Sequence, residues 1–136
     1  MGVVRFYACA GEAERVVLRL LQKAALESAS TWVMGQAAAL KTLSDALWRQ
    51  DGFFAHAGPD ASESVRRRSA LVLSVERPSQ SVGLLILLDV LSPDAEGLVA
   101  ERLFDVFGSA APQRMAARER FRWHQRQGAQ PESVQV

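Results

Sequence analysis

The chain has 136 residues, of which 49% are hydrophobic and 23% are charged, a balance typical of one soluble globular domain. Its formal net charge of +1 gives no argument for nucleic-acid binding, and its single cysteine excludes an internal disulfide and a cysteine-based metal cluster. Residues 1–10 do not resemble a secretory signal, and the longest apolar run is too short to span a bilayer, so we expect a cytoplasmic protein.

Two strand–helix units open the chain. The β-branched and aromatic residues over 3–7 predict a first strand. Residues 12–28 follow as a helix, because their apolar side chains recur every three or four positions. A second strand over 31–34 ends at Gly35, and a second helix is predicted over 36–48.

A long connection over residues 49–68 separates these units from the rest of the chain. It contains glycines, a proline and three consecutive arginines, and a connection of this length inside a compact domain often carries function. Two more strands are predicted over 70–75 and 83–90, because both segments are rich in branched apolar residues.

The last third of the chain is less regular. The pattern over 98–107 is compatible with a strand or a helix and suits a helix slightly better. A final helix is predicted over 111–126, ended by Gly128. The polar residues 129–136 are predicted to be a disordered tail, which leaves residues 1–128 as the folded domain.

The order of these elements predicts an α/β fold, a single-domain three-layer sandwich with helices on both faces of a mixed, mainly parallel sheet. The arrangement is Rossmann-like, but no glycine-rich phosphate loop follows the first strand, and no P-loop occurs. A nucleotide-using enzyme with a degenerate loop over 8–11 is therefore the weakest hypothesis. His56 and His124 are far apart and no pair of carboxylates is evident, so we expect no metal, no cofactor and no catalytic residue. Cys9 is predicted to be a core residue rather than a nucleophile.

The predicted C-terminal helix is strongly basic, with five arginines against one glutamate. Arg114, Arg118 and Arg122 repeat every four residues and form one stripe, with Phe121 at its edge. Guanidinium groups bind carboxylates bidentately, and an apolar cleft beside them would accept an aromatic ring. The pattern fits the binding of an acidic peptide that ends in an apolar residue. A solvated basic face with Phe121 in the core is the alternative.

Aromatic residues also cluster where the second helix meets the long connection. Trp48, Phe53 and Phe54, close to His56, are candidates for an interface anchor or for a small satellite core. The arginines at 66–68 are either a solvated run or a contact to a phosphate backbone. A direct single-stranded nucleic-acid-binding protein that uses these arginines and the C-terminal stripe is the alternative function.

Three segments together resemble one known family. Residues 43–48, followed by Phe53 and His56, resemble the pattern L-D-x-x-L-W, loop, S-F-x-P-H of the chi subunit of bacterial DNA polymerase III. Residues 117–122 resemble the A-R-E-R-Y-K/R motif on the last helix of that family, and residues 5–7 resemble its first strand. The resemblance keeps order and spacing over about residues 3–128.

This resemblance implies an accessory protein of the clamp-loader complex, with an α/β fold and no catalytic activity. Chi subunits bind the psi subunit and the acidic C-terminal tail of single-stranded-DNA-binding protein, which ends in Asp residues, Pro and Phe. Contact with DNA would be indirect, with no membrane association, and the protein would be a monomer alone and a heterodimer with its partner. Residues 103–107 would form a strand.

The motif match also assigns residues to each partner. Those expected at the tail of the single-stranded-DNA-binding protein are Arg118, Phe121 and Arg122, with Arg114 on the same stripe. Those expected at psi are Trp48 and Phe53, with Phe54 beside them.

Overall fold

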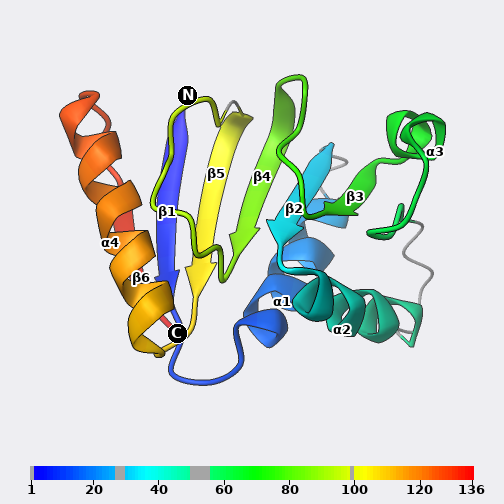
Figure 1. The fold of residues 1–136 in the computed structure, drawn as a ribbon, viewed down its shortest axis with the longest axis horizontal. Coiled ribbons are helices and arrows are strands. Elements are labelled where there is room, and N and C mark those ends of the chain that lie inside the picture. Colours follow the sequence, from blue (N-terminus) through cyan, green and yellow to red (C-terminus); the bar gives the residue numbers. More distant parts are fainter. Residues whose placement is uncertain (1, 27–29, 50–55, 99) are drawn as a thin grey trace.

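The computed structural model describes residues 2–26, 30–49, 56–98 and 100–136. These residues form one six-stranded sheet with the strand order β3-β2-β4-β5-β1-β6, covered by helices on both faces (Figure 1). The elements are β1 (Val3–Ala8), α1 (Ala13–Leu26), β2 (Thr31–Gly35), α2 (Ala37–Trp48), α3 (Glu63–Arg68), β3 (Leu71–Ser74), β4 (Val82–Leu88), β5 (Ala100–Phe107), α4 (Ala111–Arg126) and β6 (Glu132–Gln135). The predicted three-layer α/β sandwich is confirmed.

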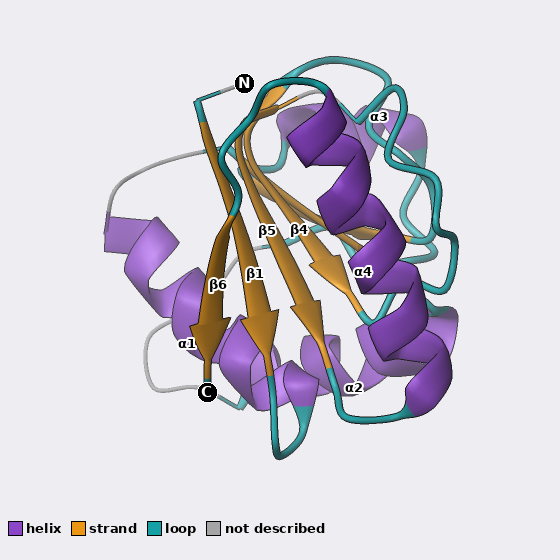
Figure 2. Ribbon diagram, turned by 90° about the vertical axis from the view of Figure 1, so that its left-hand side faces the viewer, coloured by secondary structure: helices purple, strands orange, loops and turns teal. Residues whose placement is uncertain are grey.

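The core has two parts because the sheet is buried on both faces. Alternate residues of β4 point to opposite sides, so that Ile86 packs with α1 and α2, whereas Leu85 and Leu87 face α4. Figure 2 shows the sheet between these two helical layers. Burial on both faces explains why β4 reads as an unbroken apolar run instead of an alternating one.

Every strand pairing among the described residues is parallel, so the antiparallel part of the expected mixed sheet is not found there. Strands β3 and β4 are consecutive in the sequence, yet they pair with opposite edges of β2. The connection 75–81 therefore returns past the end of β2. It can be short because β3 has only four residues.

Residues 98–107, whose pattern is compatible with a strand or a helix, contain β5. This segment is a strand, as the family resemblance implies. It lies between β4 and β1, where it is covered on both faces. Phe104 and Val106 pack on the side of α1, and Leu103 packs on the side of α4. Its mixture of Leu, Phe and Val satisfies both cores, which is why its apolar pattern also fits a helix.

The C-terminal residues differ from the expected disordered tail, because Glu132–Gln135 form β6 and pair in parallel with β1. The chain first turns at Gly128, whose φ of +86° places it in the left-handed region. Beyond the strand, the Val136 N–H donates to the Ala8 carbonyl and the Ala10 N–H donates to the Val136 carbonyl, each at 3.0 Å. An edge strand held by backbone hydrogen bonds needs few apolar side chains, so its polar sequence resembles that of a tail.

Candidate functional site

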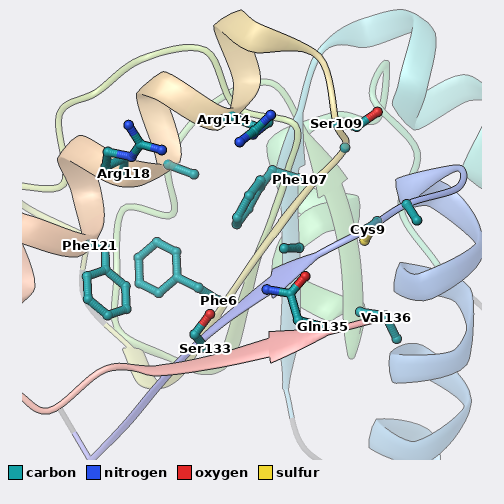
Figure 3. Close-up of a pocket in the computed structure, with 14 residues that line it drawn as sticks. Phe6, Cys9, Phe107, Ser109, Arg114, Arg118, Phe121, Ser133, Gln135 and Val136 are labelled. Carbon is teal, nitrogen blue, oxygen red and sulfur yellow. The ribbon is translucent and has the colours of Figure 1, made fainter.

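The chain leaves the neighbouring strands β1 and β5 toward opposite faces of the sheet. From β1 it continues into α1 on one face, and from β5 it continues into α4 on the other. In a parallel sheet this divergence opens a crevice beyond the carboxyl ends of the strands, where ligands commonly bind. A cavity of about 680 Å³ lies at this point, between α4, β1 and β6 (Figure 3).

The inner part of the cavity is aromatic. Phe6 is buried, and its ring meets Phe121 of α4 edge-on, with the ring centroids 5.0 Å apart. Phe107, at the end of β5, also lines the cavity. Phe121 is only partly buried, so its ring serves both the core under α4 and the cavity surface. This surface can accept an apolar side chain.

Two arginines border the same cavity. Arg114 and Arg118 lie one turn apart on α4, and both are exposed (Figure 3). Neither has an ion pair within the described residues, so both charges are available to a ligand. Arg122 does not line the cavity. Its guanidinium contacts the Glu119 carboxylate at 2.8 Å on the exposed side of the helix.

The start of α4 adds positive potential near these arginines. Ala110 occupies the N-cap position, and no side chain accepts a hydrogen bond from the first turn there. The positive end of the helix dipole therefore lies near Ser109 and Arg114, which line the cavity. The site therefore joins an apolar surface to a cationic border, which suits a ligand with both an aromatic and an anionic part.

A buried ion pair fixes α4 to the sheet. Arg120 and Asp105 both have fully buried side chains, and the guanidinium donates to the two carboxylate oxygens at 2.6 and 3.0 Å. The same guanidinium also donates to the carbonyls of Val90 at 2.8 Å and Ser92 at 2.5 Å. Burial raises the pKa of the Asp105 carboxyl, and the hydrogen bonds from Arg120 oppose that shift.

This pair was missed in the sequence, where Arg120 was counted only as one of the five arginines of a basic helix. The available signal was Asp105 itself, a carboxylate inside an apolar strand. A buried carboxylate requires a cationic or hydrogen-bonding partner.

His124 lies one turn after Arg120 and is also buried, with 2% of its surface exposed. Its ring lies 6.1 Å from that of Phe6, and its Nε2 atom has no hydrogen-bond partner among the described residues. Burial lowers the pKa of the His124 imidazole, and the charge of Arg120 adds to this. The described residues contain no group of His, Cys, Asp and Glu side chains that could hold a metal ion.

The aromatic cluster at the end of α2 is partly described. Trp48 is 53% exposed, and its ring stacks on His56 with the centroids 4.7 Å apart and the planes inclined by 39°. His56 Nε2 and Ser44 Oγ share a hydrogen bond of 2.8 Å, which fixes the imidazole to α2. Phe53 and Phe54 lie outside the described residues.

The arginine run is at the end of the short helix α3, which was expected to be part of a loop. Arg66 contacts the Glu76 carboxylate at 3.6 Å and borders a second cavity of about 680 Å³, near Arg77. Arg77 in turn pairs with Asp94 at 3.3 Å. Both arginines are already engaged by carboxylates, which reduces their capacity for an added anion.

The model of the family described as DNA polymerase III chi subunit, HolC, matches residues 1–132. The chain belongs to the DNA polymerase III chi subunit family. It is therefore an accessory subunit of the replicative polymerase, as the resemblance implies. A search of curated proteins finds no match to the chain.

Within this chi-family chain, the motif 117–122 divides into three structural roles. Arg118 and Phe121 face the cavity, Arg120 joins the helix to β5, and Glu119 pairs with Arg122 on the outside. The chi-family match ends at Glu132, so it contains only the first residue of β6. No helix in the described ranges is long and apolar enough to cross a membrane.

Proposed function

We propose that this chi-family subunit connects the clamp loader to single-stranded-DNA-binding protein, without a catalytic activity of its own. The acidic C-terminal tail of that protein would bind in the cavity under α4, and the psi subunit would bind at the Trp48 cluster. The protein would be a cytoplasmic monomer when alone and a heterodimer with psi, and its contact with DNA would be indirect.

The tail site rests on one observation, which is that the aromatic cavity and two arginines without an ion pair among the described residues share one opening. The terminal Phe of the tail would pack against Phe6, Phe107 and Phe121. Its carboxylates would pair with Arg114 and Arg118. Arg122, on the next turn, would contact acidic residues farther from the end of the tail.

The expected affinity follows from these contacts. Burial of one Phe-sized side chain contributes roughly 1.5–3 kcal/mol. Exposed ion pairs add only about 0.2–1 kcal/mol each and weaken as salt rises. Because ordering the tail opposes binding, we expect a Kd on the order of micromolar that increases with ionic strength.

The psi site is supported by the exposure of Trp48, since a large aromatic ring on the surface is a common interface anchor. Trp48 ends α2, which packs on the opposite face of the sheet from α4. Two partners could therefore bind at the same time, as a connecting subunit requires.

Calorimetry with a peptide ending in Asp-Asp-Asp-Ile-Pro-Phe tests the tail site, at low and moderate salt. We expect micromolar binding that requires the terminal Phe and is abolished by Arg118→Glu. Arg126→Glu is the matched control, because it makes the same charge change on an exposed residue of the same helix that does not line the cavity. Equal binding by the Arg118→Glu and Arg126→Glu variants would rule out this location.

The second hypothesis, direct binding of single-stranded nucleic acid, makes a different prediction. A bare oligonucleotide should then bind with an affinity that falls steeply as salt increases. The ion pairs of Arg66 and Arg77 disfavour this function. A mobility shift by the bare oligonucleotide at low salt, without any tail peptide, would favour it over the connecting role.

A further inference from the structure

The C-terminal strand forms one wall of the cavity under α4. Ser133 and Gln135 of β6, with Val136 after it, all line the cavity. Figure 3 shows the strand on the side opposite the arginines of α4, with the Gln135 side chain directed toward Phe107. Two opposite walls of the cavity therefore come from α4 and β6, which are separated in the sequence by Gly128 and the turn around it.

The register between the strands explains which side chains face the cavity. Phe6 is aligned with Ser133 and Ala8 with Gln135, and in a parallel pair aligned residues point to the same face. Phe6 and Ala8 line the cavity, and so do their partners. Val134, between them, packs into the core on the side of α1. The alternation thus assigns two polar side chains to the cavity and one apolar side chain to the core.

Both polar side chains are free to bind a ligand. Ser133 and Gln135 are exposed, and neither side chain has a hydrogen-bond partner within the described residues. A serine hydroxyl and a glutamine amide can each donate and accept hydrogen bonds, which is what the main chain of a bound peptide requires.

The same strand restricts how a peptide can bind. Strand β6 occupies the edge of β1 through the aligned pairs from Arg5↔Glu132 to Ala8↔Gln135. An extended peptide therefore cannot add to the sheet at β1, which is a common mode of peptide recognition. A peptide that binds in the cavity would instead lie across the face of the sheet between α4 and β6, where its main chain would pass over Ser133 and Gln135.

We propose that Ser133 and Gln135 are peptide-binding residues, whose side chains hydrogen-bond to the main chain of the last residues of an acidic, aromatic-ended peptide. This inference rests on the proposed tail site and adds a second wall to it. The arginines of α4 recognise the charge of the peptide, and β6 recognises its extended backbone.

The test is calorimetry with the full chain and the peptide ending in Asp-Asp-Asp-Ile-Pro-Phe. Removal of one neutral hydrogen bond should weaken binding by about two- to tenfold, in Ser133→Ala and in Gln135→Ala. Glu132→Ala is the first control, because it shortens a side chain of the same strand that lies outside the cavity. This side chain pairs with Arg5. Circular dichroism and thermal melts establish that each variant is folded.

Charge substitutions at Gln135 give a second test of whether its side chain lies beside the bound peptide. Gln135→Glu should weaken binding of the acidic peptide and Gln135→Lys should strengthen it, and both effects should fade at high salt. Gln130→Glu and Gln130→Lys are the matched controls, because Gln130 is exposed and does not line the cavity. Their effects should be clearly smaller.

The outcomes separate this inference from the proposed function. If Arg118→Glu abolishes binding while the Ser133 and Gln135 variants bind like the controls, the β6 wall is wrong and the tail site stands. If the unmodified chain does not bind the peptide at any salt concentration, both are wrong. Weaker binding by the alanine variants, with opposite effects of the two charges at Gln135, supports the inference.

Discussion

Replacement of Arg120 by methionine tests the buried link between α4 and the sheet. Methionine has a similar length and no charge, so the substitution leaves the Asp105 carboxylate buried without its cation. Two hydrogen bonds to Asp105 and two to backbone carbonyls are lost together. Removal of one partner of a buried ion pair costs about 3–5 kcal/mol. Solvent does not screen the charges of this pair, because both side chains are fully buried.

This loss is large against the stability of a typical domain, which is about 5–15 kcal/mol. Urea unfolding followed by circular dichroism measures it. With a slope of about 1–3 kcal/mol per molar urea, the midpoint should fall by about 2 M. The loss should shrink as pH falls toward about 4, because the unpaired Asp105 can then be buried as the neutral acid.

Two further variants test whether the stability lost in Arg120→Met comes from the unpaired Asp105 carboxylate. Arg118→Met makes the same chemical change at an exposed position and should alter stability by less than about 0.5 kcal/mol. The double variant Arg120→Met, Asp105→Leu removes both charges and should recover most of the lost stability. A loss below about 1 kcal/mol in Arg120→Met alone would refute the reasoning, because leaving the fully buried Asp105 carboxylate without its partner cannot cost so little.

Three other predictions concern the site and its surroundings. Arg114→Glu should weaken binding of the acidic peptide by at least as much as Arg122→Glu, because only Arg114 lines the cavity; calorimetry with both variants checks this. The pKa of His124 is lower in the folded protein than its ordinary value of about 6.5. Below about pH 6.5 the unfolded chain therefore binds more protons than the folded protein, and the free energy of unfolding should fall as pH decreases. In His124→Phe this part of the pH dependence should disappear from urea midpoints measured between pH 7 and 5. Trp48→Ala should weaken binding to psi at least tenfold in pull-down titrations and leave peptide binding unchanged, whereas loss of both would contradict separate sites.

Helices α1, α2 and α4 and strands β1, β2 and β4 could be predicted from the sequence because their apolar spacing is local. The short helix α3 was expected to be part of a loop, and β5 was ambiguous between strand and helix. The predicted bounds of α4 agree with the structure, and those of α1 differ by one or two residues. Strand β6 could not be predicted in this way. Its hydrogen bonds join residues about 127 positions apart, and its polar composition carries no periodic signal.

The candidate site was predictable on one side only. Helical spacing places Arg114 and Arg118 on one face with Phe121 beside them, and the structure brings these three to one cavity. The opposite wall depends on which strands are neighbours, and that order follows from the whole topology. Phe6 and Gln135, at the two ends of the sequence, meet there only because β6 pairs with β1.

The buried pair also determines which arginines face the cavity. Successive residues of an α-helix are rotated by about 100°, so a helix whose Arg120 points into the sheet has Phe121 at about 100°, Arg114 at about 120° and Arg118 at about 160° from it. Arg122 lies at about 200°, on the far side, where it meets Glu119 instead of the cavity. Arg120 is thus a positioning residue for a site that it does not line. In the double variant at Arg120 and Asp105, stability should return while peptide affinity stays reduced, since only apolar packing then holds the rotation of α4. Full recovery of both would show that apolar packing alone sets the orientation of the helix.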